Sequence, residues 1–280
     1  MNAVSNVHLT GRSLPAEAFV PSRVQSKPTS HMLRMANGEA IGQIVHGYLT
    51  PEQCAIISRN FMENTGLHVR GDDVSGMTVG ADIYGKSAEQ YIKDVEAARP
   101  HVREIFEGTV SVPTMLRADI QALMPAGVTV RQATHNGVPF NDARVIRWTD
   151  SGALALKFHD DLGQLTEPTQ AVFETSKVKH PVAFNVYVSV PDEGGELEIV
   201  NVCPDLAAKE RLGIEHSGYA YPESMLADYD RISIKPQVGD LLVLAGEFVH
   251  GVRGIRGQGV RLLLNHFGGF IDDKTFVTWS

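Results

Sequence analysis

The second half of the chain, from residue 128 onward, is a series of short apolar or alternating runs separated by turn sequences. Runs rich in Val, Leu, Ile and Phe and bounded by Gly, Asn, Asp or Pro are typical of β-strands. We expect strands at 128–134, 143–148, 153–159, 182–190, 196–202, 232–234, 241–244, 260–266 and 274–279. Many short strands after a helical segment predict an α+β, mainly β fold: a double-stranded β-helix, or cupin-like jelly roll, flanked by N-terminal helices.

Helix signals are confined to the segment before residue 127. Thr50-Pro51-Glu52-Gln53 has the form of a capping box with proline at the first helical position, and it predicts a helix that ends near residue 64. Ser87 to Gln90 repeats the signal for a second helix, which Pro100 is expected to kink or divide. A third helix is expected to start at Pro113.

No linker sequence divides the chain, so we expect one domain across all 280 residues. Within it, residues 1–30 are expected to form an irregular arm. Residues 40–127 are expected to be mainly helical after a short strand at 41–49, and residues 128–280 to form the jelly-roll core. The excursion at 204–230 is too long for a tight turn and could lie over the mouth of the barrel.

The composition is that of an ordinary globular protein, with 43% hydrophobic and 21% charged residues and a net charge of −8. No basic patch predicts a nucleic-acid partner, and no apolar stretch reaches the roughly 18 residues that a membrane span requires. Cys54 and Cys203 lack zinc-type spacing, so we expect free thiols in a reducing cytoplasm. These features predict a cytoplasmic protein with a small-molecule partner, and they leave a homo-oligomer open.

His159, Asp161 and His250 form the clearest candidate for a metal site. In a strand, residues i and i+2 point to the same face, so His159 and Asp161 can converge while Asp160 faces away. His250 adds a second imidazole if its strand lies beside theirs. Two histidines and one carboxylate form a facial triad that leaves positions open and suits non-haem Fe(II). Asp160 is the alternative ligand if the strand is bulged at that point.

Arg261 is the candidate anchor for a dicarboxylate co-substrate. If the strands around His250 and Arg261 form a hairpin about residues 254–257, these two positions face each other and share one side of the sheet. A guanidinium there offers a planar fork that matches a carboxylate. The alternative is an ordinary exposed arginine on a strand.

Several short motifs, taken in order and spacing, carry a family resemblance. The barrel half resembles the Fe(II)/2-oxoglutarate-dependent dioxygenases in His159-x-Asp161, Gly194–Leu197, Gly239–Leu244, His250 and Arg261. A closer likeness reaches into the N-terminal half and concerns the carrier-independent halogenases of welwitindolinone biosynthesis. It rests on Ala81–Gly85, Gly194–Leu197, Pro236–Asp240 and the terminal Trp279-Ser280. That branch also includes hydroxylases of small amino-acid derivatives, such as N-succinyl amino acids.

The resemblance implies a catalytic Fe(II) held by His159, Asp161 and His250, with 2-oxoglutarate as co-substrate and O2 as oxidant. The halogenases place glycine where this chain has Asp161, which frees a position for chloride, so the carboxylate implies hydroxylation instead of halogenation. The implied reaction is hydroxylation of an unactivated C–H bond in a small molecule, with free and N-acyl amino acids as candidates. Desaturation or ring closure is the alternative within the family.

Other pocket residues are expected on weaker grounds. By resemblance Arg147 approaches 2-oxoglutarate or the substrate, and a structural salt bridge is the alternative. Asn185 shares a strand face with Tyr187 and can hydrogen-bond the co-substrate. Lys157 shares the face of His159 by alternation, and it either holds a substrate carboxylate or reaches solvent. By resemblance alone, the substrate pocket is also lined by Gly80, Ala81 and Ile83.

Two other classes of protein remain candidates. One is a non-catalytic jelly-roll sensor with a structural or regulatory metal, and the other is a zinc hydrolase that uses the triad with a bound water. Arg261 argues against the sensor, because such a protein has no need of a dicarboxylate anchor beside a metal ligand. A zinc hydrolase would show no dependence on oxygen. The remaining histidines lack partners in the pattern and are expected to be structural or exposed.

Overall fold

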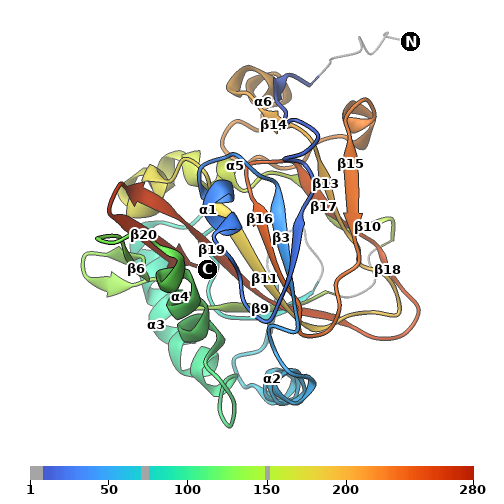
Figure 1. Ribbon diagram of the computed structural model, residues 1–280. Coiled ribbons are helices and arrows are strands. Elements are labelled where there is room, and N and C mark those ends of the chain that lie inside the picture. The colour runs from blue at the N-terminus through green and yellow to red at the C-terminus, as the bar shows by residue number, and fades with distance from the viewer. Residues whose placement is uncertain (1–8, 71–75, 149–151) are drawn as a thin grey trace.

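Two sheets frame the protein (Figure 1), and residues of both sheets line a cavity. The structure is a computed structural model that describes residues 9–70, 76–148 and 152–280. Across these residues helices and strands are mixed along the chain, and strands predominate after residue 128. This agrees with the α+β, mainly β fold that the sequence predicts.

The larger sheet has ten strands in the described part of the chain. Its main path runs in spatial order through β2 (Ser22–Gln25), β3 (Gly42–His46), β16 (Leu241–Ala245), β11 (Val182–Ser189), β19 (Arg261–Asp272), β9 (Arg144–Trp148), β5 (Met77–Val79) and β4 (His68–Val69). Off this path, β20 (Thr275–Trp279) pairs with β19 and with β6 (Thr129–Gln132). The strand β16 is buried throughout, which explains its continuous apolar run.

The smaller sheet has four antiparallel strands within the described residues. In spatial order they are β10 (Leu154–His159), β17 (His250–Arg253), β13 (Leu197–Val200) and β15 (Arg231–Ile234). The chain crosses repeatedly between the sheets, because β9, β11, β16 and β19 belong to the larger sheet and β10, β13 and β17 to the smaller one. Three short pairs are separate: β1 (Gly11–Arg12) with β14 (Cys203–Pro204), β7 (Thr134–His135) with β8 (Val138–Pro139), and β12 (Glu193–Gly194) with β18 (Ile255–Arg256).

The three long helices follow the sequence signals. The capping box at Thr50 and Gln53 is formed in full at the start of α2 (Pro51–Glu63). The others are α3 (Ala88–Glu104) and α4 (Val112–Leu123), and the three contact β11, β5 and β6 respectively. Shorter helices are α1 (His31–Ala36), α5 (Leu162–Thr166), α6 (Leu206–Leu212) and the 3-10 turns η1 (Pro168–Val172), η2 (Glu174–Lys177) and η3 (Glu223–Leu226).

Two expectations for the N-terminal half are corrected. Pro100 does not divide α3, which continues to Glu104. Tyr91, Val95 and Val102 are buried on both sides of the proline, and this packing outweighs the roughly 3 kcal/mol that proline costs inside a helix. The N-terminal arm is also more regular than expected, although its residues 1–8 lie outside the described part. Its β2 pairs in parallel with β3 and extends the larger sheet.

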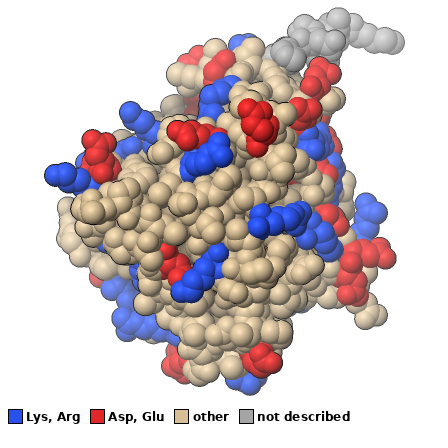
Figure 2. All heavy atoms as spheres, viewed as in Figure 1, with Lys and Arg blue, Asp and Glu red and all other residues tan. Residues whose placement is uncertain are grey.

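The face of the molecule shown in Figure 2 carries charges of both signs, with Lys and Arg close to Asp and Glu and uncharged surface between them. Among the described residues, no helix is both long enough and apolar enough to cross a membrane.

Candidate metal centre

His159 and His250 lie opposite each other on neighbouring strands. His159 ends β10, His250 begins β17, and the two are register partners with ring centroids 4.3 Å apart. Each Nδ1 lies 2.8 Å from a backbone carbonyl oxygen, that of Lys157 for His159 and that of Phe248 for His250. A carbonyl only accepts, so each Nδ1 must carry the proton. The Nε2 atom of each ring is therefore left as an acceptor, which is the form that binds a metal.

Asp161 reaches the two histidines by a different route from the one that strand alternation predicts. It lies beyond the end of β10, at the N-cap of α5, where its backbone is αR. Its amide nitrogen bonds the Gly246 carbonyl at 2.7 Å, which places the carboxylate beside the histidines. Oδ1 is 3.8 Å from His159 Nε2 and Oδ2 is 3.6 Å from His250 Nε2. One ligand atom from each of the three lies within 4.8 Å of the others, so the predicted convergence is confirmed.

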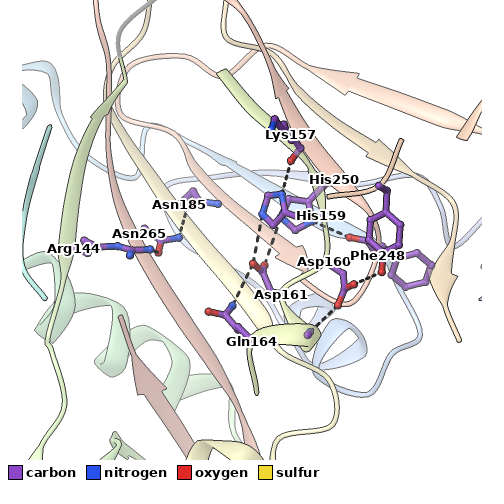
Figure 3. A network of polar contacts seen from close by, with 12 residues as sticks. Arg144, Lys157, His159, Asp160, Asp161, Gln164, Asn185, Phe248, His250 and Asn265 are labelled. Atoms are coloured by element: carbon purple, nitrogen blue, oxygen red, sulfur yellow. Dashed lines mark hydrogen bonds and ion pairs between the residues drawn. The ribbon is translucent and has the colours of Figure 1, made fainter. Parts of the chain in front are cut away.

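Asp160, the alternative ligand, is fully engaged elsewhere. Its Oδ1 accepts from Lys209 Nζ at 2.8 Å and from the Gly163 amide at 2.9 Å. Its Oδ2 accepts from the Tyr221 hydroxyl at 2.6 Å. Both oxygens are satisfied, so Asp160 anchors the 204–230 excursion, and Asp161 supplies the carboxylate that points toward the histidines (Figure 3).

The electrostatics of the triad suit a cation. Burial, and then the neighbouring His250, lowers the pKa of His159 to about 3, so its imidazole is neutral at pH 7. Burial raises the pKa of Asp161 to about 6, and its Oδ2 has no hydrogen-bond partner among the described residues. A buried carboxylate oxygen without a donor is costly unless a positive charge meets it. The neutral imidazole of His159, the Nε2 atom of His250 and this oxygen therefore fit a divalent metal ion.

The triad opens into a cavity of about 370 Å³ that is lined by both sheets. The inward side chains of the larger sheet alternate regularly along the strands. They are Arg144, Ile146 and Trp148 on β9, Ala183 and Asn185 on β11, and Arg261, Leu263, Asn265 and Phe267 on β19. The smaller sheet contributes Leu156, Leu197 and Val252 beside the histidines. From the 204–230 excursion, His216, Ser217 and Tyr219 also line the cavity, as expected for a segment over its mouth.

Arg261 is buried in this cavity at 2% exposure. Its guanidinium carbon lies 4.5 Å from the Trp148 ring centre and 5.2 Å from that of Tyr187, and Nη2 bonds the Tyr187 hydroxyl at 3.0 Å. Nε and Nη1 have no hydrogen-bond partner in the part of the chain that the structure describes. The Arg261 guanidinium is always charged and has two nitrogen donors without a partner, so it is suited to bind an anion.

The predicted hairpin between the strands of His250 and Arg261 is wrong, although both residues line the cavity. His250 lies on β17, which pairs with β10 and β13 in the smaller sheet. Arg261 lies on β19, which pairs with β9 and β11 in the larger sheet, and its partner across the strands is Trp148. The two residues therefore approach from facing sheets.

Two predicted pocket residues lie outside the cavity lining. Arg147 falls between the inward residues of β9, and its Nη1 lies 4.0 Å from Met62 Sδ on α2. Lys157 is exposed, with Nζ 5.8 Å from the Tyr219 ring centre. The pairing of β10 with β17 is irregular on both sides of Leu156, so strict alternation fails and Leu156 takes the inward place expected for Lys157.

Of the other predicted pocket residues, some line the cavity and some lie behind its lining. Asn185 lines the cavity, and Ile83 does so from the loop after β5. Gly80 and Ala81 lie behind it: a Cβ at Gly80 would come within 2.7 Å of the Ala143 carbonyl, and the Ala81 carbonyl accepts from Asn141. Sequence reasoning missed the cavity residues Arg144, Gln164 and Asn265. For Arg144 and Asn265 the available signal was their alternation with Ile146 and Leu263.

Comparisons with known proteins agree with this geometry. The family model described as "Carrier-protein-independent halogenase WelO5" matches residues 21–280. An L-isoleucine 3(1)-dioxygenase of Pantoea ananatis (strain AJ13355) is 27% identical over 252 residues, which cover 85% of this chain and 82% of that protein. The crystal structure of an N-substituted L-amino acid dioxygenase from Burkholderia ambifaria AMMD has a TM-score of 0.55 at 14% identity, covering 90% of this chain and 91% of that chain. At that identity the likeness concerns the fold. Since the family model spans both sheets and the triad, the chain belongs to the family of the carrier-protein-independent halogenase WelO5.

Proposed function

We propose that this protein is an Fe(II)- and 2-oxoglutarate-dependent dioxygenase that hydroxylates an unactivated C–H bond of an amino acid, free or N-acylated. The observation that carries the proposal is one cavity with two features: a His-Asp-His triad that retains its carboxylate, and a buried arginine with two unused donors. The dioxygenase activity of the Pantoea relative supports the reaction class and the amino-acid substrate.

His159, Asp161 and His250 would hold the iron through the two Nε2 atoms and the Asp161 carboxylate. When bound, the ferrous ion supplies the chelation of 2-oxoglutarate and the activation of O2 for C–H oxidation. The protein itself orients the two histidine ligands, because the Lys157 and Phe248 carbonyls hold both imidazole rings with Nε2 toward the cavity. The Asp161 carboxylate occupies the position that the halogenases leave for chloride, which supports hydroxylation.

Arg261 would anchor the distal carboxylate of 2-oxoglutarate through Nε and Nη1. The rings of Trp148 and Tyr187 hold its guanidinium in place, so the donors need no rearrangement before they bind. Asn185 would add a polar contact on the same inner face, where it accepts a hydrogen bond from Asn265 at 3.0 Å. Leu156, Leu197 and Val252 exclude water from the opposite wall.

We also propose that the two sheets form a double-stranded β-helix within a single domain. The repeated crossing of the chain from one sheet to the other supports this topology. The two cysteines are unpaired, which supports a reducing cytoplasm as the location.

The visible absorption spectrum of the protein under anaerobic conditions tests the proposal. Fe(II) is added first and 2-oxoglutarate second, with Zn(II) in place of Fe(II) as the control. We expect a weak charge-transfer band that needs both Fe(II) and 2-oxoglutarate. Folded, iron-loaded protein without the band would contradict the proposal and favour a metal-binding sensor or a zinc hydrolase.

With the band present, substrate-triggered oxygen consumption across a panel of amino acids identifies the substrate, and product masses separate hydroxylation from desaturation.

A further inference from the structure

We propose that Arg144 is the anchor for the carboxylate of the substrate, at a position in the cavity separate from the co-substrate anchor Arg261. The proposal rests on the proposed function and adds to it a residue that selects the substrate by its acid group. It predicts that a free carboxylate is required for binding, in free and N-acyl amino acids alike.

Arg144 is a buried cation whose hydrogen-bond and ring contacts are with neutral groups, and the Asp161 carboxylate acts on it only through space. Its exposure is 6%, and it lines the cavity from the start of β9. Nη2 donates to Asn265 Oδ1 at 3.2 Å, and the guanidinium carbon lies 5.5 Å from the Tyr84 ring centre. Nε is buried without a hydrogen-bond partner among the described residues, and none of their carboxylates forms an ion pair with Arg144. A buried charge in such surroundings is costly until an anion joins it.

The two arginines lie too far apart to serve one carboxylate. In the pairing of β9 with β19, Arg144 is opposite Asn265 and Arg261 is opposite Trp148. Along β9, Arg144 and Trp148 are four residues apart, which corresponds to about 13 Å between their Cα atoms. Ile146 and Leu263, also register partners, form an apolar step on the inner face between them. The cavity therefore has a cationic end at Arg144 and another at Arg261.

Besides Arg261, the arginines that line the cavity are Arg70 and Arg144; Arg144 is the more buried of the two, and its Nε is buried without a hydrogen-bond partner among the described residues, which makes it the better match for a second anionic ligand. Arg261 is matched to the distal carboxylate of 2-oxoglutarate, and Asp161 faces the metal position. Asp160 is neutralised by Lys209. Figure 3 shows Arg144, Asn265 and Asn185 as a hydrogen-bonded row on the side of the cavity that faces the triad. A carboxylate on Arg144 would leave the rest of the molecule in the cavity, between this sheet and the triad.

This arrangement also constrains which carbon is oxidised. With the carboxylate at Arg144, the apolar part of the substrate would lie over Ile146 and Leu263, opposite the two histidines. The reacting C–H bond would then belong to the aliphatic side chain, separated from the acid group by several bonds.

The test is calorimetric titration of the anaerobic holoenzyme, loaded with Fe(II) and 2-oxoglutarate, so that no turnover occurs. The probes are L-isoleucine, L-leucine, L-valine, L-methionine and their N-acetyl forms, and the tightest is then compared with its primary amide. The variant is Arg144→Met, which keeps an unbranched apolar stem and removes the charged guanidinium. Arg147→Met is the matched control, because it removes an arginine from the opposite face of the same strand.

We expect Arg144→Met to raise the Kd of the acid by about thirtyfold or more, since a buried ion pair loses one partner. The amide is expected to bind wild type about as weakly as the acid binds the variant, and its affinity should not change on substitution. The Kd of 2-oxoglutarate and the charge-transfer band should be those of wild type. Arg147→Met should leave every value unchanged.

Three results would overturn the assignment. Arg144→Met could weaken 2-oxoglutarate instead of the amino acid, which would make Arg144 part of the co-substrate site. Acid and amide could lose affinity equally, which would indicate a structural role only. Wild type could show the band but bind none of the carboxylate probes. Absence of the band from wild type is a separate result, because it contradicts the proposed function itself.

Discussion

His159 and His250 face each other across β10 and β17, and each ring is held by the carbonyl of the residue two positions before it in the chain. The two Nε2 atoms are therefore directed by backbone hydrogen bonds that exist without a metal. A site prepared in this way needs little rearrangement to bind an ion. The single charged ligand beside the histidines is Asp161, and the first prediction concerns it.

Asp161→Asn is expected to lower Fe(II) affinity by roughly a hundredfold or more and to abolish hydroxylation, because a neutral amide replaces the anionic ligand. Asp161→Gly, which introduces the glycine of the halogenases, should also lose hydroxylation but keep some iron binding through His159 and His250. Both are measured by metal titration and product formation. Asp160→Asn is the control and should retain iron affinity. Full activity of either Asp161 variant would show that another residue is the ligand.

Arg261→Met is expected to weaken 2-oxoglutarate binding by about a hundredfold, with iron affinity unchanged, since the distal carboxylate loses its buried partner. Titration of the charge-transfer band gives the Kd. Arg261→Lys should recover only part of the loss, because an ammonium cannot reproduce the planar fork of a guanidinium. Unchanged co-substrate affinity in Arg261→Met would remove this residue from the binding site.

Lys209→Met is expected to lower the free energy of unfolding by about 3 to 5 kcal/mol, because it leaves the Asp160 carboxylate buried without its cation. Urea unfolding of the metal-free protein measures the loss. The double variant Asp160→Asn with Lys209→Met should be less destabilised than Lys209→Met alone. Lys27→Met breaks a pair whose lysine side chain is 75% exposed, and should cost no more than about 1 kcal/mol. Equal losses in the two lysine variants would contradict this account.

His266 is expected to make the protein less stable in acid. Burial lowers its pKa from 6.5 to about 4, so between these values the unfolded chain binds a proton that the folded protein does not. Stability is therefore lost as pH falls from 6.5 to 4, by roughly 2 to 3 kcal/mol in total. The measurement is urea unfolding of metal-free wild type and His266→Gln across this range. The difference between the two proteins isolates His266, and parallel pH profiles would exclude it.

Most of the longer strands after residue 128 and the long helices were predictable because their signals are local. The capping box at Thr50 and Gln53 involves residues three positions apart, and it forms as predicted. Alternation is also reliable where pairing is regular: on β9 and β19 every second residue faces the cavity. The same rule places Arg147 outside and Arg144 inside once one inward residue of β9 is known. The sequence alone did not say which residue that was.

The smaller sheet resisted prediction because its geometry depends on partners far away in the chain. Irregular pairing of β10 with β17 exchanges the places expected for Lys157 and Leu156. Asp161 meets the histidines through a turn into α5 that the Gly246 carbonyl stabilises, and not through strand alternation. His250 and Arg261 are brought together by the stacking of two sheets, which no spacing along the chain encodes.

By itself, the sequence determined which side chains are the candidate metal ligands, the helix that begins at Pro51 and the positions of most strands. These depend on residue chemistry and on hydrogen bonds between near neighbours. Only the tertiary structure decided which arginines enter the cavity and that Asp160 pairs with Lys209 instead of joining the histidines. Those choices depend on which strands pair and on how buried charges are matched across two sheets, and both are set when distant segments pack together.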